Sequence, residues 1–126
     1  MRYVLDSTLL IDHANADPGA LAMLRSLFEN GHELYTCDVV TCESLSLGDA
    51  GEIRHIGSLL DALEYVSTSP SAARWAGTSR RTLHQAGGKR AVGDALIAGV
   101  AAELDAVVVT RNGRDFERQG IRTLAY

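Results

Sequence analysis

A run of three valines, Val107–Val109, is the feature that most limits what this chain can fold into. All three side chains are β-branched and apolar, and no polar residue alternates with them. A strand with one face in water alternates apolar and polar residues, whereas an uninterrupted apolar run is typical of a strand covered on both faces. Such strands belong to parallel sheets with helices on either side, so the run predicts an α/β protein.

The rest of the chain repeats this plan, because short strand-like runs alternate with stretches of helical periodicity. Strands are predicted at residues 3–5, 33–37, 65–66, 107–109 and 122–124. Helices are predicted between them, and the last of these, over residues 95–104, is apolar on nearly every face. A helix of that kind packs against a sheet. The pattern therefore predicts a sandwich with a mostly parallel central sheet.

Capping and breaking residues set the expected helix ends. Ser7 and Thr8 are expected to cap the first helix, and Asp17 to cap the second one ahead of a proline. Asp38 is expected to cap a helix over residues 39–47, and Gly48 with Gly51 to end it.

Length and composition are those of one soluble domain spanning residues 1–126, since 46% of the residues are apolar and 22% are charged. No run of eighteen apolar residues occurs, and Asp6 follows the start too closely for a signal peptide, so we expect a cytoplasmic protein that does not enter membranes. Cys37 and Cys42 do not have zinc-ligand spacing and are expected to be free thiols.

Carboxylates lie where these strands end. Asp6 follows the first strand directly, Asp94 opens the helix before the valine run, and Asp115 comes shortly after that run. Because ligands bind outside the carboxyl ends of parallel strands, we expect these segments to meet at one edge of the sheet. Glu43, on a helix, is a fourth candidate. Oxygen ligands of this kind hold Mg²⁺, which phosphodiester cleavage uses to activate water, so the pattern favours a metal-dependent nuclease.

Each acidic residue also has a structural explanation. Asp6 and Asp94 could simply cap helices, and Glu43 could be a solvated helix residue, as most helical glutamates are. Asp115 could pair with a neighbouring arginine, and Asp12 is expected to be a solvated carboxylate. Taken one at a time, these residues do not define a site; their common placement after strand-like runs does.

Four blocks of the sequence resemble the motifs of PIN-domain ribonucleases, the toxin half of VapBC toxin–antitoxin pairs. The first block is residues 4–12 (VLDSTLLID) and the second is residues 42–48 (CESLSLG). The third is residues 94–98 (DALIA) and the fourth is residues 109–116 (VTRNGRDF). Their order and spacing make the resemblance more specific than any single block. Two positions depart from the family pattern: Ser7 replaces the commoner threonine, and Asn112 stands where many members carry aspartate, so the fourth acidic role falls to Asp115.

The resemblance implies a PIN-like three-layer α/β/α sandwich and hydrolysis of RNA phosphodiester bonds. It implies that Asp6 and Asp94 bind Mg²⁺, for which Mn²⁺ can substitute, and that Glu43 and Asp115 complete the acidic cluster. The residues expected to orient water or the metal ligands are Ser7, Thr110 and Asn112.

The resemblance also implies partners. It implies a VapB-type antitoxin that covers the acidic cleft, and the apolar helices near residues 9–28 and 53–63 are expected to receive an antitoxin helix. A homodimer and a hetero-oligomer with the antitoxin are expected as well.

The net charge of −4 hides a division between two halves of the chain. Residues 1–64 hold three basic against eleven acidic side chains, a balance of −8, whereas residues 65–126 hold nine against five, a balance of +4. The acidic half suits a basic antitoxin, and the basic half suits a phosphate backbone. A charge run is usually a solvated helix face; because this one lies beside Asp94, phosphate contact is the competing reading. The expected RNA-binding residues are Arg80, Arg81, Lys89 and Arg90.

Two other functions compete with the ribonuclease. One is a PIN-fold binding module for RNA or antitoxin without catalysis, which the intact Asp6, Glu43 and Asp94 argue against. The other is a receiver-like phospho-acceptor domain, which needs a pair of acids after the first strand and a late lysine. The sequence has no acid beside Asp6 and no lysine after Lys89, so this function ranks last.

Overall fold

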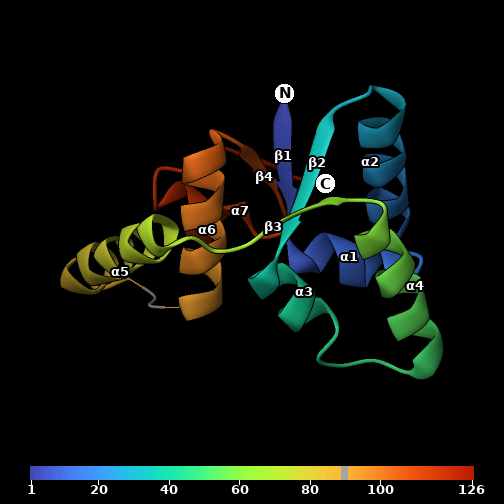
Figure 1. Cartoon of the computed structure of the whole chain (residues 1–126), viewed down its shortest axis with the longest axis horizontal. Coiled ribbons are helices and arrows are strands. Elements are labelled where there is room, and N and C mark those ends of the chain that lie inside the picture. The colour runs from blue at the N-terminus through green and yellow to red at the C-terminus, as the bar shows by residue number, and fades with distance from the viewer. Residues whose placement is uncertain (89–90) are drawn as a thin grey trace.

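The structure is a computed structural model that describes residues 1–88 and 91–126 (Figure 1). Strands and helices alternate along most of the chain, as the sequence pattern predicts. In chain order the elements are β1 (Arg2–Leu5), α1 (Ser7–Ala14), α2 (Pro18–Glu29), β2 (Glu33–Cys37), α3 (Asp38–Ser44), α4 (Ala50–Asp61), β3 (Glu64–Val66), α5 (Pro70–Gln85), α6 (Val92–Leu104), β4 (Val107–Val109), α7 (Gly113–Glu117) and β5 (Thr123–Leu124).

The strands form one sheet in the order β3-β2-β1-β4-β5, and every neighbouring pair is parallel. The chain starts at the centre with β1, moves outward through β2 to β3, and then returns to place β4 on the other side of β1. The direction of winding thus reverses between β1 and β4. Open α/β sheets form their ligand crevice at this point, outside the carboxyl ends of the two strands.

The pairing of β1 with β4 brings two polar residues to that crevice. Leu5 pairs with Val109, and the Asp6 backbone N–H donates to the Val109 carbonyl at 3.0 Å, one residue beyond β1. On the other side of β4, the Thr110 N–H donates to the Leu124 carbonyl at 3.1 Å. Asp6 and Thr110 are therefore the first residues past two adjacent strands and share one edge of the sheet.

Helices cover both faces of the sheet, which gives the three-layer sandwich (Figure 1). Helices α5, α6 and α7 lie on one side and α1, α2 and α4 on the other; α5 packs on α6, and α1 packs on α2 and α4. Helix α3 contacts both α1 and α6, so it joins the two helical layers. The expected fold class is confirmed, with a sheet that is entirely parallel.

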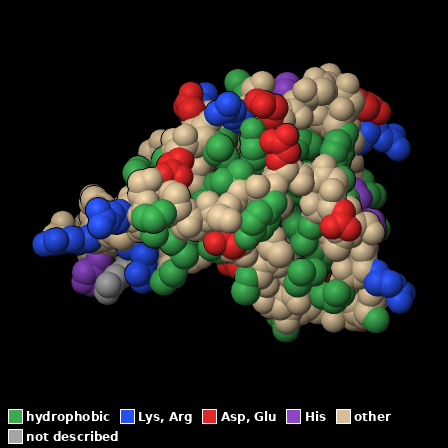
Figure 2. Space-filling model, viewed as in Figure 1, with side chains coloured by type: hydrophobic (Ala, Val, Ile, Leu, Met, Phe, Trp, Pro, Cys, Tyr) green, Lys and Arg blue, Asp and Glu red, His purple; other side chains and the backbone are tan. Residues whose placement is uncertain are grey.

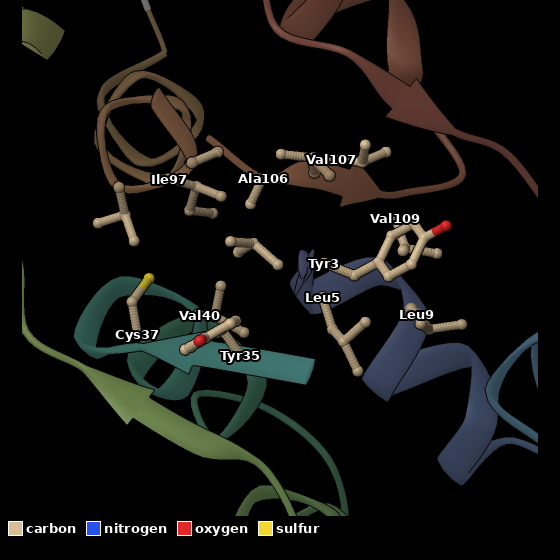
Figure 3. Packing of buried hydrophobic residues seen from close by; sticks show 14 of the residues in the cluster. Tyr3, Leu5, Leu9, Tyr35, Cys37, Val40, Ile97, Ala106, Val107 and Val109 are labelled. Carbon is tan, nitrogen blue, oxygen red and sulfur yellow. The ribbon is translucent and has the colours of Figure 1, made fainter. Parts of the chain in front are cut away.

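The hydrophobic core lies between the sheet and the helices that cover its two faces. Val4, Leu5, Val108 and Val109 are completely buried, as the uninterrupted valine run predicts. Figure 3 shows how side chains from the strands and from α1, α3 and α6 fill the space between the layers. No helix in the described parts of the chain is long and apolar enough to cross a membrane.

Several expected helix ends are wrong by a few residues. Asp6, rather than Ser7 or Thr8, is the N-cap of α1. Helix α3 begins at Asp38 itself and ends at Ser44, short of the predicted 47. Gly48, with a φ of +117°, does break the chain, but Gly51 lies in the first turn of α4, because Asp49 caps that helix from two residues earlier.

Helix α6 starts three residues earlier than expected, at Val92. Its N-cap is Ala91, whose side chain makes no capping hydrogen bond. A capping role for Asp94 is therefore wrong, and this carboxylate lies within the first turn. A carboxylate there is favoured by the helix dipole.

Candidate active site

The Asp6 carboxylate is the centre of the candidate site. It is only 4% exposed and accepts three hydrogen bonds: from the Thr110 hydroxyl at 2.8 Å, the Ser7 N–H at 2.9 Å and the Thr8 hydroxyl at 3.2 Å. Burial raises the pKa of Asp6 above its ordinary value of 3.8, and the hydrogen bonds from Thr110, Ser7 and Thr8 offset only part of that rise. The ionised group would thus be stabilised by a cation.

Glu43, on α3, is held beside Asp6 by Ser7. The Ser7 hydroxyl donates to Glu43 Oε1 at 3.3 Å. Burial, and then the negative charge of Asp6, raise the pKa of Glu43. The two carboxylates therefore repel each other at a shared position, which is the electrostatic condition that a divalent cation relieves.

Gly93, in the first turn of α6, gives the Glu43 carboxylate its space. A Cβ at this position would lie 2.6 Å from Glu43 Oε2, closer than real side chains come. The next residue along α6 is Asp94. The absence of a side chain at Gly93 thus leaves room for the Glu43 carboxylate against the first turn of α6.

Asp94 and Asp115 meet in a narrow pocket between α6 and α7. Leu83, Ala91, Arg118 and Gln119 form the rest of its wall. The Gln119 side chain receives a hydrogen bond from Ser79 of α5 at 2.8 Å and donates to the Asp115 carbonyl at 3.0 Å, so it fixes α7 against α5. The residues expected to form the acidic cluster thus lie in two places, with Glu43 beside Asp6, and with Asp94 and Asp115 in the wall of this pocket.

Of the residues expected to support the acidic cluster, two contact it through their side chains and one does not. The hydroxyls of Ser7 and Thr110 bond to the carboxylates, whereas Asn112 is exposed at the start of α7 and its contact to the site is a backbone N–H bonded to the Thr110 hydroxyl at 3.1 Å. Thr8 was expected only as a cap, yet its hydroxyl bonds to Asp6 and lies 3.4 Å from that of Thr110. Its position on α1, two residues after Asp6, is the sequence signal for this role.

The prediction for Asp12 is wrong. Its carboxylate is not solvated but accepts hydrogen bonds from Arg111 Nη1, at 2.9 Å to each oxygen, and from the Tyr126 hydroxyl at 2.7 Å. One of the two neighbouring arginines that could have paired with Asp115, Arg111, is thus engaged on α1, while Arg114 is the other. Sequence reasoning missed this because the three residues are 99 and 114 positions apart.

The oxygen donors fit a hard divalent cation by type. Asp6 is a buried carboxylate with a raised pKa, and Glu43 adds a second carboxylate that Asp6 repels. Across residues 1–88 and 91–126, no group of three His, Cys, Asp or Glu side chains is arranged as a ready-made metal site. The fit therefore rests on the chemistry of the donors and on their position at the strand ends.

The predicted phosphate-binding residues flank this edge only in part. Arg80 is half-buried and Arg81 is exposed, both on α5, while Lys89 and Arg90 lie outside the described residues. Figure 2 shows Lys and Arg side chains gathered at the end of the α5 projection, at the left of the view.

The chain thus forms a parallel α/β/α sandwich with a buried carboxylate, Asp6, at the end of β1, beside the strand where the winding reverses. A family model described as PIN domain matches residues 3–121 of the sequence. The chain belongs to the PIN domain family.

Individual relatives agree with this assignment. Ribonuclease VapC19 of Mycobacterium tuberculosis is 28% identical over 115 residues, which cover 90% of each chain. Among solved structures, VapBC2 from Rickettsia felis, bound to a DNA fragment from their promoter, has a TM-score of 0.85 at 22% identity and covers 100% of this chain and 99% of that one. A toxin–antitoxin complex from Klebsiella pneumoniae has a TM-score of 0.74 at 17% identity, with 90% and 89% covered.

Proposed function

We propose that this protein is a VapC-type endoribonuclease toxin, which hydrolyses RNA phosphodiester bonds with Mg²⁺ and is inhibited by a VapB-type antitoxin. The observation that carries the proposal is the Asp6 carboxylate, buried at the winding reversal between β1 and β4 with Glu43 beside it. Membership of the PIN domain family and the similarity to a protein named as a ribonuclease support it.

In this proposal Asp6 and Asp94 hold the Mg²⁺ ion, with Mn²⁺ as a substitute, and Glu43 and Asp115 complete the acidic cluster. When bound, the cation supplies charge that stabilises the phosphate in the transition state and lowers the pKa of the attacking water. The raised pKa values of Asp6 and Glu43 favour this assignment, because a cation offsets both the burial and the mutual repulsion of the two groups.

The hydroxyl groups around Asp6 have a positioning role. Thr110 and Thr8 both contact one oxygen of Asp6, Oδ2, while the Ser7 N–H binds the other, Oδ1. Ser7 also holds Glu43, so one residue sets the relation between the two carboxylates. Asn112 is proposed to orient water or a metal ligand from the rim of the site. Partners of this kind fix the orientation of metal ligands.

The RNA strand is proposed to bind over the basic half of the chain. Arg80, which is half-buried, and the exposed Arg81 on α5 would make charge-assisted contacts to phosphates, which fix position without reading sequence. The protein is proposed to act in the cytoplasm, where its RNA substrate would be met. The proposed phosphate-binding residues are Arg80, Arg81, Lys89 and Arg90.

The antitoxin is proposed to bind the opposite helical layer. A hollow of about 650 Å³ lies there, lined from α1, α2 and α4, and Leu21 and Phe28 on its wall are 40% and 45% exposed. Large exposed apolar side chains in a groove suit an amphipathic helix. A homodimer and a hetero-oligomer with the antitoxin complete the proposed assembly.

The test is cleavage of labelled RNA by the purified protein with Mg²⁺, with EDTA, and by an Asp94→Asn variant. Cleavage is expected with Mg²⁺ alone and is expected to disappear in the other two conditions. Activity that survives both would overturn the metal-dependent mechanism. RNA or antitoxin binding without any cleavage would instead favour a catalytically silent binding module.

A further inference from the structure

The side chain of Arg111 is held beside the candidate site by a contact that the catalytic proposal does not use. Arg111 directly follows Thr110, the residue that bonds to Asp6. Its Nη1 atom donates to both carboxylate oxygens of Asp12, on α1, at 2.9 Å each. The Asp12 side chain is only 15% exposed, whereas 56% of the Arg111 side chain is exposed. The carboxylate is thus the fixed partner and the guanidinium the one that faces outward.

Tyr126 fixes the carboxylate from the other side. Its hydroxyl donates to Asp12 Oδ2 at 2.7 Å, and its ring lies against the first turn of α2, near Gly19. Burial, followed by the hydrogen bond to Asp12, raises the pKa of Tyr126 well above its ordinary value of 10.0. The hydroxyl therefore keeps its proton and remains a donor.

The loop after β4 does not need this ion pair to hold its backbone. The Arg111 N–H already bonds to the Thr8 hydroxyl at 3.3 Å, and the Asn112 N–H bonds to the Thr110 hydroxyl at 3.1 Å. An ion pair with one exposed partner adds little to stability. The ion pair instead restricts the position of the Arg111 side chain, which is long and charged, next to the carboxylates of Asp6 and Glu43.

The chemistry of that position calls for a cation. An RNA phosphate that approaches Asp6 and Glu43 meets two negative groups, and a guanidinium can accept it because its N–H groups form a planar fork that matches phosphate oxygens. Within the described part of the chain, Arg111 bonds to Asp12 through its Nη1 atom alone. The other N–H groups of the guanidinium can therefore bind a ligand. Holding the side chain in advance also lowers the entropy lost on binding.

We propose that Asp12 and Tyr126 hold Arg111 at the rim of the acidic site, where its guanidinium binds the phosphate of the RNA strand that enters the site. This inference rests on the proposed ribonuclease function and adds a substrate contact to it. Arg111 touches the substrate, while Asp12 and Tyr126 act through Arg111 as positioning residues.

Arg122 provides a matched control. Its guanidinium pairs with Asp105 at 3.1 Å and is 58% exposed, nearly the same as Arg111, but this pair lies at the amino ends of β4 and β5, away from the proposed site. Arg111→Ala and Arg122→Ala therefore each remove one positive charge and one ion pair from a side chain of similar exposure. They differ in the end of the sheet at which they do so and in the acidic partner, since Asp105 is 95% exposed and Asp12 only 15%.

The experiment measures binding of a short fluorescein-labelled, mixed-sequence, single-stranded RNA by anisotropy in EDTA, over a series of salt concentrations. Arg111→Ala is expected to weaken binding about three- to tenfold and to lower the salt slope by about one phosphate contact, whereas Arg122→Ala leaves both nearly unchanged. Arg111→Lys is expected to fall between wild type and Arg111→Ala, because it keeps the charge but loses the fork.

The direction in which Asp12→Asn changes RNA binding distinguishes two roles for Asp12. If Asp12 were only one more negative charge, its removal would leave RNA binding unchanged or strengthen it. Since the inference makes Asp12 the support of Arg111, Asp12→Asn is expected to weaken binding and raise KM with little change in kcat, and Tyr126→Phe to do so less strongly. Equal or tighter binding by Asp12→Asn would overturn the inference, as would equal effects of the two arginine variants.

Two readouts separate this inference from the proposed function. Thermal melting of each variant shows whether it folds, and Arg111→Lys with Tyr126→Phe provide milder changes if Asp12→Asn does not. Wild-type protein that cleaves RNA, together with an Arg111→Ala variant that binds it normally, would overturn the inference alone. Wild-type protein that neither binds nor cleaves RNA would overturn the proposed function and the inference with it.

Discussion

Two aspartates at the ends of neighbouring strands show how one sequence pattern can serve two purposes. Asp6 follows β1 and Asp38 follows β2, and each lies at the start of a helix. Burial raises the pKa of Asp6, in spite of its hydrogen bonds. At Asp38 burial acts in the same direction, but hydrogen bonds from Thr68 and Val39 outweigh it and lower the pKa.

The difference lies in burial, because both carboxylates accept three hydrogen bonds, but Asp6 is only 4% exposed whereas Asp38 is half-buried. Asp38 accepts the Thr68 hydroxyl at 2.5 Å, the Thr68 N–H at 3.3 Å and the Val39 N–H at 3.1 Å, so it ties α3 to the segment before α5. Asp6 remains less stable in its charged form and has Glu43 beside it. An acidic residue whose charge the protein does not fully compensate is a better candidate for ligand binding than one whose charge it does.

The largest expected effect that tests this comparison is that of Asp6→Asn. Cleavage of labelled RNA in Mg²⁺ is expected to fall at least about 100-fold, because a proposed metal ligand is lost. The melting temperature is expected to stay the same or rise, since the amide keeps the shape without the cost of a buried charge. The matched variant, Asp38→Asn, is expected to keep activity. Near-normal cleavage by Asp6→Asn would remove Asp6 from the site.

Gly93 and Gly99, the two glycines of α6, allow a second comparison between a residue beside the site and a residue in the helix packing. A Cβ at Gly93 would meet the flexible end of Glu43, so Gly93→Ala is expected to reduce cleavage about tenfold through displacement of that carboxylate. Its unfolding free energy should change by no more than about 0.5 kcal/mol. At Gly99 a Cβ would meet the backbone of Ala72, so Gly99→Ala is expected to cost about 1–3 kcal/mol of stability by separating α5 from α6.

Urea denaturation and initial cleavage rates measure these effects in the same preparations. The comparison holds if the rate is lost mainly at position 93 and the stability mainly at position 99. A Gly93→Ala protein that is as unstable as Gly99→Ala would show that the first turn of α6 is packed for stability rather than for the carboxylate.

The two aspartates should also differ in how stability depends on pH. The pKa of Asp38 is lowered, so its contribution is present above the ordinary pKa of 3.8 and is lost as the pH falls through the folded-state pKa. Asp38→Asn is therefore expected to cost about 1 kcal/mol at neutral pH and less in strong acid. The raised pKa of Asp6 has the opposite sign: it destabilises the fold increasingly as the pH rises above 3.8.

Urea unfolding of wild type, Asp6→Asn and Asp38→Asn in EDTA, at neutral pH and at a pH below 3.8, measures both trends. The expected result is that Asp6→Asn gains stability relative to wild type as the pH rises, while Asp38→Asn loses it. Parallel curves for the two variants would show that the two carboxylates have equivalent surroundings.

The smallest expected effect concerns the two charge-divided halves of the chain. Lys89→Ala with Arg90→Ala is expected to weaken RNA binding a few-fold and to lower the salt slope by about 1 to 1.5, because each phosphate contact releases a counterion. The control pair, Arg25→Ala with Arg54→Ala, removes the same charge from the acidic half. If both pairs weaken binding equally, the effect is one of net charge and not of location.

The sheet was predictable because its signal is local. The valine run and the short apolar segments show burial on both faces, and the strand ends then locate Asp6 and Thr110. Helix ends were predicted less well, because several residues compete for each cap: Asp6 took the position expected for Ser7, and Asp49 started α4 ahead of Gly51.

The parts of the site that could not be predicted depend on contacts between distant segments. Nothing near Gly93 in the sequence shows that the Glu43 carboxylate fills the space beside it, since the two are brought together by the packing of α3 on α6. The same holds for the support of Arg111 by Asp12 and Tyr126. The roles assigned to Asp94, Asp115 and Asn112 stay predictions that the cleavage assays address.

The hydrogen bond between Thr110 and Asp6 joins residues 104 positions apart. A chain emerging from the ribosome therefore exposes Asp6 long before β4 exists to pair with β1 and bring Thr110 to it. Contacts of such sequence separation form late, since the chain between them must be ordered first. In the proposed ribonuclease, a chain that has not yet added β4 therefore lacks the Thr110 support of Asp6, and cleavage is expected only after β4 has been made and paired with β1.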